Sequence, residues 1–135
     1  MQKQKYQKMA LIMATALLIP FGTPAEAEAP HKPVEIILTP EQIALQNPKQ
    51  YAKDQFAQFN WTDEQFICLG KLWGKESAWN HLADNPHSTA FGIAQMLGED
   101  SKLPHEQINN GLRYIEHRYE KPCNAWQHWQ RRNWY

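Results

Sequence analysis

A stripe of apolar residues at helical spacing leads to a single acidic side chain in the middle of this sequence. At 100° per residue, Phe66, Leu69, Trp73 and Glu76 fall within about 80° of one another on one helix face. A carboxylate at the end of an apolar stripe loses part of its hydration, which raises its pKa toward the range of a proton donor at neutral pH. A glutamate near a helix end is also a common solvated surface residue. The pattern therefore makes Glu76 a candidate acid and leaves a surface role open.

The helix that carries this stripe has a predicted N-terminal cap and two glycines of low helix propensity. Thr62-x-x-Gln65 fits a capping box, so we expect the helix to run from about residue 63 to residue 77. Gly70 and Gly74 each lower helix propensity by roughly 1 kcal/mol relative to alanine. We expect them at a place where another segment packs closely against the helix.

The same kind of pattern predicts three further helices. Apolar residues at helical spacing between 49 and 59 indicate a short first helix. Pro104 opens a second long helix and Pro122 ends it, and residues 124 to about 130 form a last short helix. The residues expected to face inward from the second long helix are Ile108, Leu112, Ile115 and Tyr119.

The remaining segments are irregular in sequence. Residues 79–103 are turn-rich, with one short extended piece from Phe91 to Gln95. Residues 28–48 contain several prolines and few large apolar groups, which indicates a linker or a loosely docked arm, with a possible short strand at 34–38. We expect a compact, mainly helical domain over residues 49–135, with a small irregular or β-like lobe at about 79–100.

The tryptophans can serve either the core or a sugar-binding surface. All six lie between Trp61 and Trp134. Aromatic faces stack on sugar rings, but tryptophan in a small domain is more often core. We expect Trp61, Trp73 and Trp126 in the core and leave Trp79 and Trp129 open.

The N-terminal residues have the pattern of an export signal. Three lysines precede an uncharged apolar run at 9–19, which is too short to span a bilayer comfortably. Pro20 and Gly22 break the run, and Ala25-Glu26-Ala27 offers a cleavage site, with residues 27–29 as a second choice. We therefore expect residues 1–27 to be a signal peptide, and an exported protein of the periplasm, the extracellular space or the cell wall. An uncleaved membrane anchor is the alternative, whereas a lipoprotein anchor is not expected because no cysteine follows the run.

Charge and motif content exclude several classes of function. Removal of residues 1–27 takes 3 of the 14 basic and 1 of the 14 acidic residues, which leaves a mature chain close to neutral. A nucleic-acid partner is not expected, because binding dominated by phosphates needs a basic face. His105-Glu106 lacks the second histidine of a zinc motif and the histidines are scattered, so we expect neither a metal nor a cofactor.

The two cysteines, Cys68 and Cys123, both belong to the mature domain. In an oxidising compartment an even pair predicts a disulfide, here closing a loop of about 55 residues. The alternative is two buried free thiols. Cys68 lies about 160° from Phe66 of the apolar stripe, so the bond would tie the C-terminal segment to the back of the helix that presents Glu76.

Motifs in a consistent order run from Glu76 to the C-terminus. They are Glu76-Ser77, Trp79-Asn80, Ala83, Asn85-Pro86, Ser88, Gly92-Ile93, Gln95, Gly111-Leu112-x-Tyr114-Ile115-x-x-Arg118-Tyr119, Pro122-Cys123-x-Ala125-Trp126 and Trp134-Tyr135. This order resembles the lysozyme-like transglycosylase superfamily, most closely the small secreted transglycosylase SLT and resuscitation-promoting-factor-like domains. The resemblance covers roughly residues 50–135 and implies a lysozyme-like fold.

The resemblance also implies a role for each matched side chain. Glu76 would be the catalytic acid and base, and Ser77 would shape or hydrogen-bond it. Gln95 would contact N-acetyl or hydroxyl groups of the sugar, and Tyr114 would face the acid from the following helix. For Ser77, Gln95 and Tyr114 the alternative is packing or capping. The segment after Gln95 is shorter than in related domains, which leaves the substrate length open.

The carboxylates suggest a mechanism with one acid. Glycoside cleavage usually takes two carboxylates. Here Asp63 lies about 20 Å from Glu76 along one helix, Asp84 sits in a turn, and Glu99-Asp100 lies on a loop. The family resemblance implies a lytic transglycosylase, in which the sugar's own 6-hydroxyl replaces the second carboxylate.

The expected function is therefore that of an exported, monomeric enzyme whose partner is the glycan strand of peptidoglycan. The alternatives are hydrolysis by a muramidase and a wall-binding or assembly protein without turnover.

Overall fold

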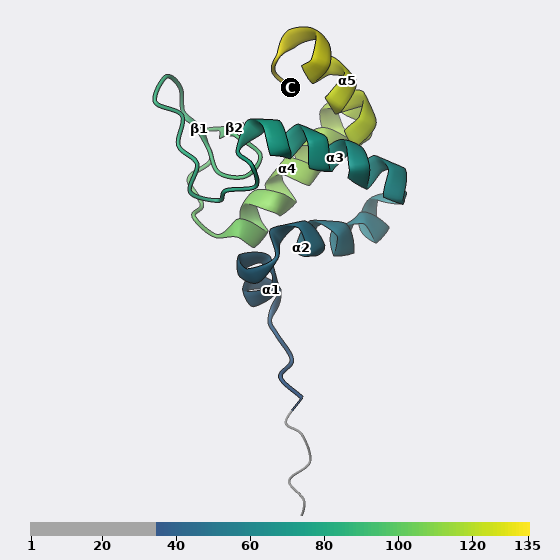
Figure 1. Cartoon of the computed structure of the whole chain (residues 1–135), viewed down its shortest axis with the longest axis vertical. Helices are drawn as coiled ribbons and strands as arrows, with labels where there is room; N and C mark the ends of the chain where they lie inside the picture. The colour runs from purple at the N-terminus through teal and green to yellow at the C-terminus, as the bar shows by residue number, and fades with distance from the viewer. Residues whose placement is uncertain (1–34) are drawn as a thin grey trace, which may run out of the picture. The chain divides into compact units, whose positions relative to one another are not determined.

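The computed structural model describes residues 35–135, which form a mostly helical structure with a small two-stranded sheet (Figure 1). The expectation of a mainly helical fold with a small β-like lobe is confirmed at this level. The predicted signal peptide, residues 1–27, lies outside the described residues. The elements in chain order are α1 Pro40–Gln46, α2 Pro48–Asp54, the 3-10 helix η1 Gln55–Phe59, α3 Asp63–Glu76, β1 Ala90–Phe91, β2 Met96–Leu97, α4 Pro104–Tyr119 and α5 Pro122–Arg132.

The segment expected to be an arm, residues 28–48, ends in a helix. Thr39 and Gln42 form a capping box at the start of α1, with the Gln42 backbone N–H donating to Thr39 Oγ1 at 3.2 Å. The following Pro40 occupies the first turn, where its missing N–H costs nothing. Ala44 is buried, and α1 packs against α4. Residues 35–38, part of the possible strand, have no regular secondary structure.

The long helix α3 has the expected bounds but not the expected cap. Thr62 makes no side-chain hydrogen bond to the first turn. The Gln65 side chain instead accepts a hydrogen bond from the Cys123 backbone N–H at 2.9 Å, at the start of α5. A partner from a distant part of the chain therefore replaces the local cap that the spacing predicts.

The predicted disulfide is present, because Cys68 and Cys123 are bonded and their Cα atoms lie 4.9 Å apart. The bond joins α3 to the first turn of α5, and α5 packs along α3 (Figure 1). The C-terminal segment is thereby tied to the helix that ends at Glu76.

The buried core contains side chains from helices α1 to α5, and most of the largest come from α3 and α4. Trp73 is fully buried, and so are the predicted inward residues Ile108, Leu112 and Ile115. Gly111 leaves room for the Trp73 ring and for Ala94, since a Cβ atom there would lie 2.7 Å from Trp73 Cζ2 and from Ala94 Cβ. This contact places the face of α3 that leads to Glu76 against α4.

Three expectations about packing need correction. Trp61 and Trp126 are only partly buried and pack at the edge of the core, whereas Trp79 is 7% exposed. A Cβ atom at Gly70 or Gly74 would meet no atom within 4 Å, so no segment packs closely against these glycines. The close approach is made at Gly111, on the facing helix.

The small lobe is a hairpin at the C-terminal end of α3 (Figure 1). Strands β1 and β2 are antiparallel, with Ala90 opposite Leu97 and Phe91 opposite Met96. Gly92 follows β1 at φ +78°, and a Cβ atom there would lie 2.4 Å from the side chain of Gln107. Glycine is therefore required at this position both for its backbone conformation and for space.

The buried Gln107 of α4 holds this lobe in place. Its Oε1 accepts from the Ile93 N–H at 3.0 Å, and its Nε2 donates to the carbonyls of His81 and Ser101 at 3.0 and 2.7 Å. A buried amide whose hydrogen-bonding groups are satisfied in this way fixes a loop that has little regular structure of its own.

Candidate active site

Glu76 is the last residue of α3, and its side chain is half-buried. Burial raises the pKa of the Glu76 carboxyl above its ordinary value of 4.5, and a hydrogen bond to the Trp129 side chain partly opposes the rise. The direction follows from the loss of water around the charged form. Glu76 thus has an environment that favours the protonated carboxyl more than bulk water does.

The turn after α3 holds Glu76 at the edge of the core. Ala78 and Trp79 both have positive φ, 54° and 65°. The Ser77 hydroxyl donates to the Ile93 carbonyl at 2.6 Å, which links the helix end to the hairpin segment. Non-glycine residues seldom adopt such φ values, and these conformations are often found at functional sites. The observed role of Ser77 is to join two segments beside the candidate acid.

Glu76 lines a hollow of about 350 Å³ between the hairpin and the C-terminal residues. Its lining includes Asn85, Gln95, Trp134 and Tyr135. Amide groups can hydrogen-bond hydroxyl and N-acetyl groups, and aromatic faces can stack on sugar rings. The hollow is thus lined for a polar ring-shaped ligand, with one carboxyl among its walls.

Gln95 contributes to this hollow from a strained backbone position at φ 50°. Its Nε2 donates to the carbonyls of Ala83 and Gly92, at 3.1 and 3.0 Å. Both amide hydrogens are therefore used to hold the loop, and the oxygen is the group left to meet a ligand.

Tyr135 lies beside Glu76, where the family resemblance led us to expect Tyr114. Its hydroxyl accepts from Trp73 Nε1 and donates to the Ala94 carbonyl, both at 2.8 Å. Burial chiefly raises the pKa of the Tyr135 hydroxyl well above 10, and the nearby Glu76 adds to the rise. Tyr135 is therefore a neutral wall of the hollow that holds α3 and the hairpin segment together.

Tyr114 lies one step farther from the acid. Its ring packs edge-on against Tyr135 with centroids 5.7 Å apart, and it lines an adjoining hollow instead of the one that contains Glu76. Of the four residues that the sequence placed in the site, Glu76 and Gln95 line the same hollow. Ser77 fixes its edge, and Tyr114 lies next to it.

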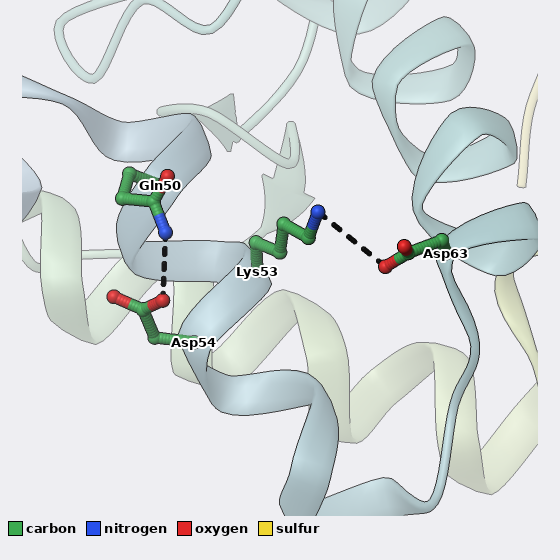
Figure 2. Close-up of polar contacts among 4 residues, drawn as sticks. All are labelled: Gln50, Lys53, Asp54 and Asp63. Carbon is green, nitrogen blue, oxygen red and sulfur yellow. Dashed lines mark hydrogen bonds and ion pairs between the residues drawn. The ribbon is translucent and has the colours of Figure 1, made fainter.

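Asp63, the residue of the same helix considered as a second carboxylate, lies at the opposite end of α3. Asp63 Oδ1 pairs with Lys53 Nζ at 3.4 Å, and close by Gln50 Nε2 donates to Asp54 Oδ1 at 2.7 Å (Figure 2). Asp63 is thus engaged with α2 and is not part of the hollow around Glu76.

The loop carboxylates are also outside this hollow. Glu99 accepts hydrogen bonds from the Ser101 N–H and from Asn110 Nδ2, each at 3.0 Å. Asp84 is exposed and forms an isolated bridge with Phe91. Among residues 35–135, Glu76 is the one acidic side chain in the lining.

A separate hollow of similar size, which does not adjoin the one around Glu76, lies on another part of the molecule. It measures about 340 Å³ and is lined by residues that include Gln55, Asn109, Arg113 and Glu116. Its carboxylate, Glu116, is exposed to solvent. This hollow lacks a desolvated acid, which makes the one around Glu76 the better candidate for chemistry.

Sequence reasoning missed several residues that build the site. Trp129, Trp134, Tyr135 and Gln107 act from the C-terminal segment or from α4, far from Glu76 in the chain. Gln107 is a polar residue at an inward position of a helix, which is a usable signal because buried amides must be paired. No comparable signal shows that Tyr135 returns to α3.

Within residues 35–135, no cluster of histidine, cysteine and acidic side chains is arranged to hold a metal ion. None of the helices in this part of the chain combines the length and the apolar character that a membrane span requires.

Comparisons of the chain with protein-family models, with curated proteins and with solved structures find no match.

Proposed function

We propose that this protein is an exported enzyme that cleaves the glycan strands of peptidoglycan, as a lytic transglycosylase with a lysozyme-like fold. The observation that carries the proposal is the half-buried Glu76, with a raised carboxyl pKa, as the one acidic side chain of residues 35–135 in a hollow lined by amides and aromatic rings. The sequence resemblance and the expected signal peptide at residues 1–27 support the same conclusion. The disulfide agrees with an oxidising compartment.

The chemistry balances with a single carboxyl group. Glu76 gives its proton to the oxygen that bridges N-acetylmuramic acid and N-acetylglucosamine, and the bond from the muramic C1 to that oxygen breaks. The resulting carboxylate then takes the proton from the 6-hydroxyl of the same muramic residue as that oxygen bonds to C1. The products are a 1,6-anhydro end and a new free 4-hydroxyl, no water is consumed, and Glu76 is protonated again.

This route needs no second carboxylate, which is why it suits the hollow. A retaining hydrolase places a second carboxylate about 5 Å from the acid, and an inverting one places it about 6.5–9.5 Å away, to activate water. Asp84, Glu99 and Asp100, the loop candidates for such a partner, do not line the hollow.

The test is mass spectrometry of the products after purified peptidoglycan is digested with the mature chain, its disulfide intact. We expect muropeptides with anhydro ends, which are lighter by one water than the products of hydrolysis. Reducing ends would show a muramidase instead. Absence of any cleavage, with retained sedimentation of the protein with the wall, would show a binding protein. Either of these results would overturn the proposal.

A further inference from the structure

A second hollow adjoins the one that contains Glu76. It measures about 240 Å³ and shares Gln95, Leu97 and Tyr135 with the first. The residues that it adds include Tyr114 and Arg118 of α4. Together the two hollows form one longer site, with a carboxyl in one part and a guanidinium in the other.

Arg118 lies against aromatic rings at this site. Its guanidinium carbon lies 5.3 Å from the ring centre of Trp134, 5.7 Å from that of Tyr119 and 5.9 Å from that of Tyr114. Within residues 35–135, no carboxylate pairs with Arg118, and the ion pair found there joins Lys53 to Asp63. Arg118 is exposed, so cation–π contacts of this kind favour this position of the guanidinium without fixing it, and they leave its charge without an anionic partner.

Two further arginines, Arg131 and Arg132 of α5, lie near His128 together with Arg118. Burial lowers the pKa of the His128 imidazole, and the positive charges of Arg118, Arg131 and Arg132 lower it further. Tyr119 packs against His128 with ring centres 5.3 Å apart. A planar guanidinium in such surroundings matches a carboxylate, which it can bind through two parallel N–H donors.

We propose that Arg118 makes the second hollow a subsite for a carboxylate carried by the glycan, so that the enzyme distinguishes peptidoglycan from neutral chains of N-acetylglucosamine. The inference rests on the proposed function and deepens it. In peptidoglycan the carboxylate has two sources, namely the lactyl group of a peptide-free muramic residue or the peptide stem of a substituted one. Neutral N-acetylglucosamine chains have neither.

Binding is measured in a Glu76→Gln background so that no ligand is consumed. The ligands are chitohexaose, peptide-free glycan fragments and peptide-bearing fragments, each at low salt and at 1 M NaCl. The variants are Arg118→Gln and Arg118→Lys. Arg113→Gln is the matched control, because Arg113 is exposed on the same helix, donates to Asn110 Oδ1 at 2.9 Å and lines a different hollow.

Arg118→Gln should weaken binding of carboxylate-bearing fragments by about tenfold, the typical effect of losing a charged hydrogen bond. Chitohexaose binding should not change. The affinity of Arg118→Lys for carboxylate-bearing fragments should lie between those of Arg118→Gln and the background, and 1 M NaCl should reduce the difference in affinity between Arg118→Gln and the background. Arg113→Gln should match the background. A loss with peptide-free fragments identifies the lactyl carboxylate, and a loss confined to peptide-bearing fragments identifies the stem, and both results support the subsite.

Equal weakening toward chitohexaose and toward the carboxylate-bearing fragments would show a structural role for Arg118 and overturn the subsite alone. The same holds if Arg118→Gln has no effect on any ligand. If the Glu76→Gln background binds no glycan of any kind, the subsite and the proposed function are both overturned.

Discussion

The N-terminal half of α3 is joined to other helices by a disulfide and an exposed ion pair, whereas its last turn is held by packing and by a hydrogen bond to the hairpin segment. Near the start of the helix lie the Cys68–Cys123 disulfide and the Lys53–Asp63 ion pair. At its end, Glu76 borders a hollow whose walls are the hairpin segment and the C-terminal residues. The comparison suggests that one end secures the fold and that the other end is shaped for chemistry.

The largest expected effect on stability comes from the first end. Cys68→Ser should lower the free energy of unfolding by about 4 kcal/mol, the chain-entropy value for a loop of this length. The bond lies away from the hollow, so the rate of glycan cleavage at low temperature should change little. Thermal unfolding and cleavage assays of the same preparation provide the measurement. A large loss of activity in a folded variant would contradict the division between the two ends.

A change at the other end should affect both stability and activity. Gly92→Ala forces a side chain into φ +78° and places its Cβ atom against Gln107, which should cost roughly 3 kcal/mol in total. Gly98→Ala is the matched control, because Gly98 has φ +72° but open space around it. The control should show the backbone cost alone, on the order of 1 kcal/mol. Equal destabilisation by the two variants would show that the Gln107 side chain moves aside for the new Cβ atom with no loss of folding free energy.

The helix itself could be predicted from the sequence, and so could the disulfide. Their signals are simple: an apolar stripe at helical spacing for α3, and a single pair of cysteines in the sequence for the disulfide. The side of α3 on which Cys68 lies followed from the same geometry.

The local cap and the far walls of the site could not be predicted in this way. Gln65 bonds to Cys123 instead of to Thr62, because a long side chain at a helix start can reach a distant N–H as well as a near one. Tyr135 reaches Glu76 only because α5 returns along α3, which is a property of the tertiary fold. Spacing in the sequence carries no information about either contact.

The hydrogen bond from Trp129 gives a smaller, directional test of the acid. Trp129→Phe removes the contact that lowers the pKa of Glu76, so that pKa should rise further. The acid must be protonated to act, so the alkaline limb of the kcat/KM profile should move to higher pH. Trp126→Phe is the control, because Trp126 stacks on Trp129 at 5.4 Å and is not among the groups that shift the pKa of Glu76. A downward movement of the limb would contradict the assignment.

The same raised pKa has a consequence for stability. A carboxyl whose pKa is higher in the folded state than in the unfolded state favours folding when protonated. The contribution of Glu76 is therefore complete below its ordinary value of 4.5 and is lost as the pH rises through its folded pKa. Thermal unfolding of Glu76→Gln should lack this component of the pH dependence.

The smallest expected effect is a gain in stability in the middle of α3. Gly70→Ala should stabilise the protein by about 0.5–1 kcal/mol, since alanine has the better helix propensity and its Cβ atom meets open space. Cleavage should not change, because the substitution touches neither end. Denaturant unfolding measures the gain. Destabilisation would mean that the backbone at this position has less room than the contacts indicate.

The most direct test of the central claim is the cleavage rate of Glu76→Gln on purified peptidoglycan. The amide has nearly the same size as the acid but cannot donate a proton of suitable pKa, so the rate should fall by about 10² to 10⁴-fold. Glu116→Gln is the matched control, because Glu116 is exposed and lines the separate hollow that also contains Gln55 and Arg113. It should cleave like the parent, and both variants should remain folded and bind the wall. If Glu76→Gln clears peptidoglycan as fast as the parent, Glu76 is not the acid and the proposed mechanism is wrong.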